Sequence, residues 1–264
     1  MKHKLKLGTL ALGLLTLVSV NAQAQTTLTA VNTSAQAASS FAGASFGSPM
    51  AFGADWGSVG VGVFAQTLSK SVTGTRGDGS AGVAFGLGDA DRYVGFETAV
   101  AIADLTTYNG NHFGDGGSLS FKLHTNLPGG AAFAVGVTNT ARWGTVNGQR
   151  ASVYAVGTKV FKIGSTSPHA LIVNLGIGDE GFQELNTTTG LAKSGAGVFG
   201  SLAYYICPQI SVIADYTGRF LNAGVSIAPF KTIPVTVTLG GVNLTDRYNT
   251  NPQAAISVGY GFQF

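Results

Sequence analysis

The chain has little charge and almost no cysteine. Only 10% of its 264 residues are Asp, Glu, Lys or Arg, against about 25% in ordinary soluble domains. The single cysteine, Cys207, excludes an intramolecular disulfide framework. A soluble β-sandwich normally carries charged and polar residues on its outer faces, and this sequence has few to place there.

Long hydrophobic runs are also scarce. A membrane-spanning helix needs about 20 apolar residues, and the run from Leu10 to Val20 is shorter. Three lysines precede it and an A-x-A site ending at Ala24 follows it, which predicts a secretory signal peptide over residues 1–24 with cleavage near Ala24. Its removal takes three of the 15 basic residues and none of the 12 acidic ones, leaving 12 of each. The basic balance therefore gives no support for a nucleic-acid partner.

Glycine is abundant, and apolar residues alternate with small or polar ones. The chain has 39 glycines, where about 7% is usual. A period of two indicates strands with one apolar face. Twelve segments show it, an even count as in bacterial barrels, and the sequence predicts an all-β fold: a 12-stranded antiparallel up-and-down transmembrane β-barrel over residues 57–264. The predicted strands are 57–66, 80–88, 93–103, 118–125, 131–140, 151–161, 170–178, 195–206, 210–217, 220–228, 235–243 and 253–264.

The lengths of the connections test this prediction independently. Outer-membrane barrels have short periplasmic turns and longer extracellular loops. If both termini are periplasmic, five of the six outer connections are longer than every inner one, and only the link at Gly218 and Arg219 is short. The inner connections also hold turn-forming residues such as Pro128, Pro168 and Pro208.

The last strand, Ala254 to Phe264, places Ile256, Val258, Tyr260, Phe262 and Phe264 on one face. A terminal strand of this kind, ending in Phe, resembles the assembly signal of Gram-negative outer-membrane barrels. The resemblance implies the barrel-assembly machinery as a partner through Phe264, outer-membrane lipid and lipopolysaccharide as surroundings, and the bacterial outer membrane as location.

Two further stretches carry resemblances. Ser48 to Gly57, followed by a strand and Gly86-Leu87-Gly88-Asp89, looks like uncharacterised bacterial outer-membrane proteins. The stretch from Ala214 to Val225, with Val235 to Leu239, is similar to hairpins of barrels associated with exopolysaccharide export. These resemblances imply a fold and a location rather than an activity.

Residues 25–56 precede the predicted barrel. Gln25 to Ser45 is rich in Ala, Ser and Thr without a strong period. We expect a flexible periplasmic lead-in. The alternative is a plug that folds back into the lumen.

Few charged side chains fall on the predicted inner face. Counting from the third connection places Glu97 opposite His124, with Lys122 as a diagonal neighbour. A Glu97–Lys122 ion pair that fills the lumen is favoured over a selectivity element. The predicted lumen-lining set is Glu97, Lys122, His124, Lys159, Asn174, Asp215 and Asn222.

The sequence predicts no catalytic, cofactor or metal site. His112, Asp115 and Ser118 lie close together in a glycine-rich connection, but an exposed loop histidine explains them better than an outer-leaflet lipid hydrolase does. The predicted function is a porin-like channel for passive diffusion of small polar solutes. The alternative is a non-conducting structural or assembly barrel accessory to envelope polysaccharide export. The sequence predicts no oligomeric state.

Overall fold

The computed structural model describes residues 41–67, 77–106, 112–164, 168–186, 191–249 and 251–264. The predicted signal peptide and residues 25–40 lie outside this part of the chain, so both remain predictions.

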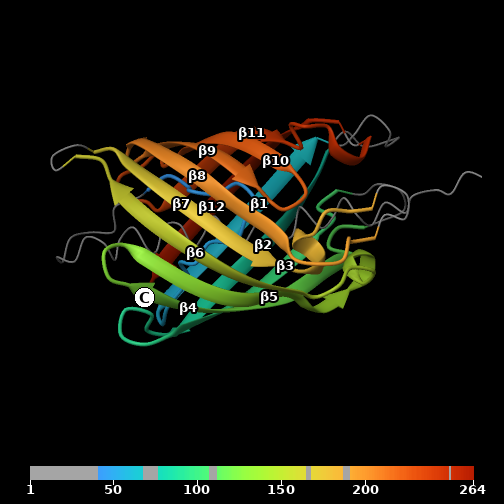
Figure 1. Ribbon diagram of the computed structural model, residues 1–264, viewed down its shortest axis with the longest axis horizontal. Coiled ribbons are helices and arrows are strands. Elements are labelled where there is room, and N and C mark those ends of the chain that lie inside the picture. The colour runs from blue at the N-terminus through green and yellow to red at the C-terminus, as the bar shows by residue number, and fades with distance from the viewer. Residues whose placement is uncertain (1–40, 68–76, 107–111, 165–167, 187–190, 250) are drawn as a thin grey trace, which may run out of the picture.

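The described residues form a closed antiparallel β-barrel, which confirms the predicted fold class (Figure 1). Each strand pairs with its neighbours in sequence, and β1 closes the barrel against β12 through a register running from Ser58↔Gln263 to Gln66↔Ala255. The strands are β1 (Ser58–Thr67), β2 (Gly77–Gly88), β3 (Gly95–Ala103), β4 (Gly116–Leu127), β5 (Ala131–Trp143), β6 (Ser152–Lys162), β7 (Ala170–Gly178), β8 (Gly197–Cys207), β9 (Ile210–Tyr216), β10 (Leu221–Ile227), β11 (Val235–Val242) and β12 (Gln253–Gln263).

The two ends of the barrel differ in the length of their connections. We call the end with the connections 89–94, 128–130, 163–169, 208–209 and 228–234 the turn end; the C-terminus lies there, at the left of Figure 1. Among the described residues, the opposite, loop end holds three short 3-10 helices, η2 (Gly144–Val146), η3 (Glu180–Phe182) and η4 (Arg247–Asn249). No helix in the described ranges is long and apolar enough to cross a membrane.

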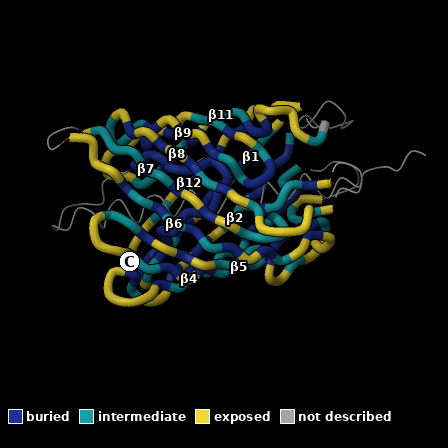
Figure 2. The backbone as a smooth tube through the Cα atoms, viewed as in Figure 1, coloured by how far each residue is buried: buried dark blue, intermediate teal, exposed yellow. Residues whose placement is uncertain are grey.

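Burial alternates along the strands, as the colours of Figure 2 show. On β12, Ile256, Val258 and Tyr260 are exposed while Ala255 and Ser257 are buried. Successive side chains of a strand point to opposite faces, so large apolar residues cover the outside and small or polar residues face the interior. Outward Val61 stands opposite Tyr260 and Val63 opposite Val258 across the closing pair of strands.

One strand has the opposite facing to the one we predicted. The sequence placed Tyr154, Val156 and Val160 of β6 on the apolar outer face, but the structure buries all three and exposes Val153 and Phe161 instead. Because β6 has apolar residues on both faces, its alternation does not distinguish inside from outside, and a shift of one residue reverses every side chain.

Candidate functional site

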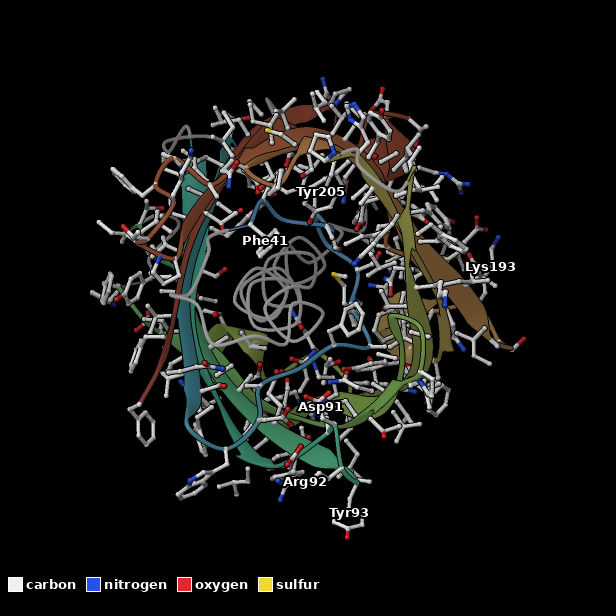
Figure 3. The ribbon with its side chains drawn as sticks, turned by 90° about the vertical axis from the view of Figure 1, so that its left-hand side faces the viewer. Phe41, Asp91, Arg92, Tyr93, Lys193 and Tyr205 are labelled. Carbon is white, nitrogen blue, oxygen red and sulfur yellow. The ribbon has the colours of Figure 1, made fainter. Side chains whose placement is uncertain are left out.

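A segment without regular secondary structure, residues 41–55, runs inside the barrel. Figure 3 looks along the barrel from the turn end and shows this segment in blue within the ring of strands, with Phe41 and Tyr205 on the inside and Tyr93 pointing outward. We call residues 41–55 the inner segment. Every residue of it from Phe41 to Ala54 is buried. The choice between a lead-in and a plug for residues 25–56 stays a prediction, because residues 25–40 lie outside the described part of the chain.

The inner segment follows the wall in reverse strand order. Near the turn end, the Ala42 N–H donates to the Pro208 carbonyl and the Tyr205 hydroxyl donates to the Ala42 carbonyl (2.9 and 2.6 Å). From Phe41 to Ala54, the contacts of the segment move from β11, β10, β9 and β8 to β7, β6, β4 and β3, and it bonds to an inward side chain of each. Those side chains are Thr236, Ser226, Asn222, Ser211, Asp215, Ser201, Tyr205, Asn174, Thr158, Lys122, His124 and Glu97.

Asp215 is the strongest single anchor of the inner segment. Its Oδ2 accepts hydrogen bonds from the Ser45 hydroxyl (2.7 Å) and from the N–H groups of Phe46 and Ser48 (3.1 Å each). Its Oδ1 accepts from the Ser48 hydroxyl (3.0 Å). The side chain is 1% exposed. Four donors from one turn therefore solvate a carboxylate that burial has removed from water.

Two predicted lining amides also bind the inner segment. Asn174 donates from Nδ2 to the Pro49 carbonyl (2.8 Å) and accepts at Oδ1 from Thr158, whose Oγ1 accepts from the Ala51 N–H. Asn222 donates to the Phe46 carbonyl at 3.2 Å. The backbone of a buried segment without a ladder needs such partners, and these amides supply them.

Glu97 and Lys122 form the second charged anchor. The Lys122 Nζ lies 3.3 Å from Glu97 Oε2, and both side chains are only 3% exposed. Lys122 also donates to the Phe52 carbonyl (2.7 Å), and Glu97 accepts from the Ala54 N–H (2.9 Å). The predicted register was wrong by two residues: Glu97 stands opposite Lys122, and His124 stands opposite Gly95. The cause is β4, which begins at Gly116 rather than at residue 118.

His124 packs where two glycines leave room for its ring. A Cβ on Gly53 or on Gly95 would lie about 2.5 Å from ring atoms of His124, so neither position tolerates a side chain. The His124 Nε2 lies 3.0 Å from the Ala54 carbonyl, so Nε2 carries the proton. Nε2 is also 3.8 Å from Asp55 Oδ1. His124 thus fixes the last residues of the inner segment before β1.

Asp55 has a titration that can be tested. Burial raises the pKa of its carboxyl to about 6. The hydrogen bond from the Ala90 N–H lowers this pKa, and the nearby charges of Asp91 and Asp89 raise it. The folded protein then binds this proton more tightly than the unfolded chain, so stability falls as pH rises from about 4 to about 6. We expect Asp55→Asn to raise the thermal unfolding temperature at pH 7 by roughly 2–6 °C, and this gain to shrink below pH 5. Heat-modified gel mobility measured at both pH values checks it, and an equal gain at both would contradict it.

Lys159 does not line the lumen, which corrects the prediction. It lies on the outer face of β6, where its Nζ donates to the Gly129 carbonyl of a turn (2.7 Å) and lies 6.0 Å from the centre of the Phe161 ring. A long stem lets a lysine keep its charge at the polar edge of an apolar surface. The other six predicted lining residues all lie inside the barrel.

An aromatic cluster lies inside the barrel, and the sequence had placed Phe199 and Phe64 there but not Tyr154 or Phe182. Tyr154, Phe182 and Phe199 are buried, and the Phe182 and Phe199 rings stack with centres 4.5 Å apart. From the inner segment, Phe46 meets Phe64 of β1 with ring centres 6.2 Å apart. Aromatic contacts therefore narrow the interior at two places, and the inward facing of Tyr154 is part of the reason.

At the loop end, Arg219 fastens the longest connection, residues 179–196. It is 6% exposed and donates to the carbonyls of Gln183 (2.7 Å) and Glu180 (2.5 Å). Burial lowers the pKa of its guanidinium to about 10, so it stays protonated at neutral pH. The same connection is held at its surface by ion pairs of Glu180 with Arg150 and of Glu184 with Lys193 and Arg247.

Arg219→Ala is expected to loosen this connection. It leaves the Gln183 carbonyl without its donor and the Glu180 carbonyl with the Gln183 N–H alone, and a lost partner costs about 1–3 kcal/mol when the group stays buried. Trypsin should then cut after Lys193 at least about tenfold faster. Arg150→Ala is the matched control, because it removes an exposed ion pair worth about 0–1 kcal/mol. Equal cleavage rates in both variants would contradict the role of Arg219.

His112 and Asp115 do not assemble a catalytic triad with Ser118. The His112 side chain is 82% exposed, with Nδ1 3.5 Å from Asp115 Oδ2. Ser118 is buried on β4 and stands opposite Arg142 of β5. The described residues hold no cluster of three or more His, Cys, Asp or Glu side chains able to bind a metal ion.

The chain matches no protein-family model, and no curated protein matches its sequence. Several solved structures resemble it, three of which follow. Outer membrane protein Omp33 of Acinetobacter baumannii has a TM-score of 0.43 at 10% identity, covering 78% of this chain and 97% of that one. The beta domain of the Bordetella autotransporter BrkA has a TM-score of 0.35 at 15% identity, covering 79% of this chain and 99% of that one. The N-terminal β-barrel domain of Pseudomonas aeruginosa OprF has a TM-score of 0.20 at 14% identity, covering 78% of this chain and 98% of that one.

All three TM-scores lie below 0.5, and the identities are 15% or lower. What this barrel does therefore has to be argued from its own residues.

Proposed function

We propose that the chain is an outer-membrane β-barrel through which small polar solutes diffuse passively. The observation that carries the proposal is the division of polarity across the wall. Outward strand positions hold exposed apolar residues such as Leu202 and Val258, whereas inward positions hold Ser201, Asn174 and Ser257. An apolar band outside and a polar surface inside is the pattern that a lipid bilayer and an aqueous lumen together require.

Exposed aromatic residues at both ends support the same orientation in a membrane. Trp56, Tyr93 and Phe264 are exposed at the turn end, and Phe113 and Trp143 at the loop end. Aromatic side chains favour the two membrane interfaces. In this arrangement the turn end faces the periplasm, where Phe264 would meet the barrel-assembly machinery, and the loop end lies among lipopolysaccharide.

Passive diffusion needs no covalent chemistry from the lining. Hydroxyl and amide groups form hydrogen bonds with both water and solute. A polar molecule that enters therefore replaces the hydrogen bonds that it loses to bulk water. A twelve-stranded barrel is narrower than the 16- to 18-stranded porins. The inner segment and the buried rings of Phe64 and Phe199 reduce its bore further. We therefore expect small solutes and a small conductance.

Single-channel recording in a planar bilayer tests the proposal. Correctly folded protein, identified by its heat-modifiable gel mobility, should give discrete current steps smaller than those of a 16-stranded porin in the same salt. The control is the same preparation after heat denaturation. Folded protein that gives no steps at any voltage would refute a channel.

A second candidate is a non-conducting structural or assembly barrel. The observation that favours it is the inner segment itself, which bonds to inward side chains of eight strands from β11 to β3. A lumen closed in this way could serve to present the loops rather than to conduct. The same recording separates the two candidates.

A further inference from the structure

The wall of the barrel does not depend on the inner segment for its backbone hydrogen bonds. Every strand is paired on both sides by its neighbours, including β1 with β12. The inner segment adds no strand to this sheet. It is held mostly by side chains of the wall, about one or two from each strand it passes. Its departure would therefore leave the closed sheet unbroken.

Asp215 is the wall residue whose hydrogen bonds depend most on the presence of the inner segment. All four donors to its carboxylate come from Ser45, Phe46 and Ser48. The ion pairs among the described residues do not include Asp215. Its charge is thus solvated by donors of the inner segment and not by a cation of the wall. If the segment left, water in the lumen could take the place of these donors.

Two alternative sets of donors would make a two-state element. In the structure, the turn from Ser45 to Ser48 bonds to Asp215; with the segment released, water would bond to it, and the closed sheet would stay paired. An equilibrium of this kind shifts only by the difference in free energy between the two states. A change that weakens the donors of the turn at Asp215, and leaves the water unaffected, favours release.

We propose that residues 41–55 are a releasable lining of the lumen, latched on Asp215, and that their release widens the path for solutes. The widening rests on the proposed channel function, whereas the release does not. Phe46, which packs on Phe64, leaves the interior together with the segment. Release also breaks the bonds of the Phe52 carbonyl to Lys122 and of the Ala54 N–H to Glu97, whereas the Glu97–Lys122 ion pair stays on the wall.

Thiol labelling measures release without any need for conduction. In a Cys207→Ser background, Ala51→Cys places a thiol on the inner segment at a fully buried position beside Thr158. The protein is reconstituted in vesicles and treated with a polar, membrane-impermeant maleimide. Adding Ser48→Ala removes the hydroxyl that donates to Asp215 Oδ1 and keeps the buried carboxylate. We expect labelling to become about 10- to 100-fold faster, the effect of losing one charge-assisted hydrogen bond.

Two further variants control this experiment. Ser45→Ala removes the hydroxyl that donates to Asp215 Oδ2, so it should speed labelling in the same direction, and it stands in for Ser48→Ala if that variant does not fold. Ser152→Ala deletes the same group at a buried position of β6 whose hydroxyl accepts from the Gly181 N–H, and it should leave labelling unchanged. Heat-modifiable mobility identifies folded protein in each case.

Conductance of the same variants separates the two proposals. Larger or more frequent current steps in Ser48→Ala, together with faster labelling, support both. Faster labelling with no current in any variant refutes the channel and supports the releasable lining. Labelling that stays slow in folded Ser48→Ala and Ser45→Ala overturns the lining proposal, whatever the conductance.

Discussion

Lys122→Met is expected to destabilise the barrel by about 3–5 kcal/mol, the usual cost of removing one partner from a buried ion pair. Glu97 would keep its carboxylate in a place where it is 3% exposed, and the Phe52 carbonyl would lose its donor. Chemical unfolding in lipid vesicles, followed by tryptophan fluorescence, measures the change in the free energy of unfolding. The loss of one charge, and not the loss of side-chain volume, causes this effect, because methionine fills a similar space.

The double variant Glu97→Gln with Lys122→Met is the control for this explanation. It removes both charges, and the glutamine can still accept from the Ala54 N–H. Replacing a whole buried pair by groups of similar volume is often close to neutral. We therefore expect the double variant to recover most of the stability that Lys122→Met loses. Recovery of less than about 1 kcal/mol would show that the two side chains are not coupled.

The outer surface of the barrel could be predicted because lipid-facing strands need large apolar residues at every second position. Along β7, Val173, Leu175 and Ile177 alternate with Asn174 and Gly176, and only one facing keeps the amide inside. The difference between long and short connections follows from the same architecture, and it could be recognised from the sequence alone. Strand β6 shows the limit, because a strand with apolar residues on both faces fits either facing.

The path of the inner segment could not be predicted in the same way. Its bonds join residues far apart in the sequence, such as Ser45 with Asp215 and Ala54 with Glu97. The sequence pattern around either partner does not predict the contact. A single inward carboxylate without a nearby cation, as at Asp215, was the available signal. Such a side chain implies donors from elsewhere in the chain.

The inward polar residues thus have a role that alternation alone does not assign. Ser201, Asn174 and Thr158 would suit a water-filled lumen, and in the structure they bind the backbone of residues 44, 49 and 51. The same chemistry serves both purposes, since hydroxyl and amide groups accept either water or a peptide backbone as partner. A polar inner face therefore fits an open lumen and a lined one equally well.

Leu202→Arg tests whether the apolar outer face meets lipid. Leu202 is the middle residue of β8 and is 51% exposed, with its side chain directed away from the lumen. An arginine at the midplane of a lipid-facing strand costs about 2–4 kcal/mol, whereas an exposed substitution in water stays within about 0.5 kcal/mol. We expect unfolding in lipid vesicles to show the larger loss. Phe113→Arg, at a 66% exposed position in a loop, is the matched control and should change stability little. Equal small changes in both variants would mean that β8 faces water and that the barrel does not span a bilayer.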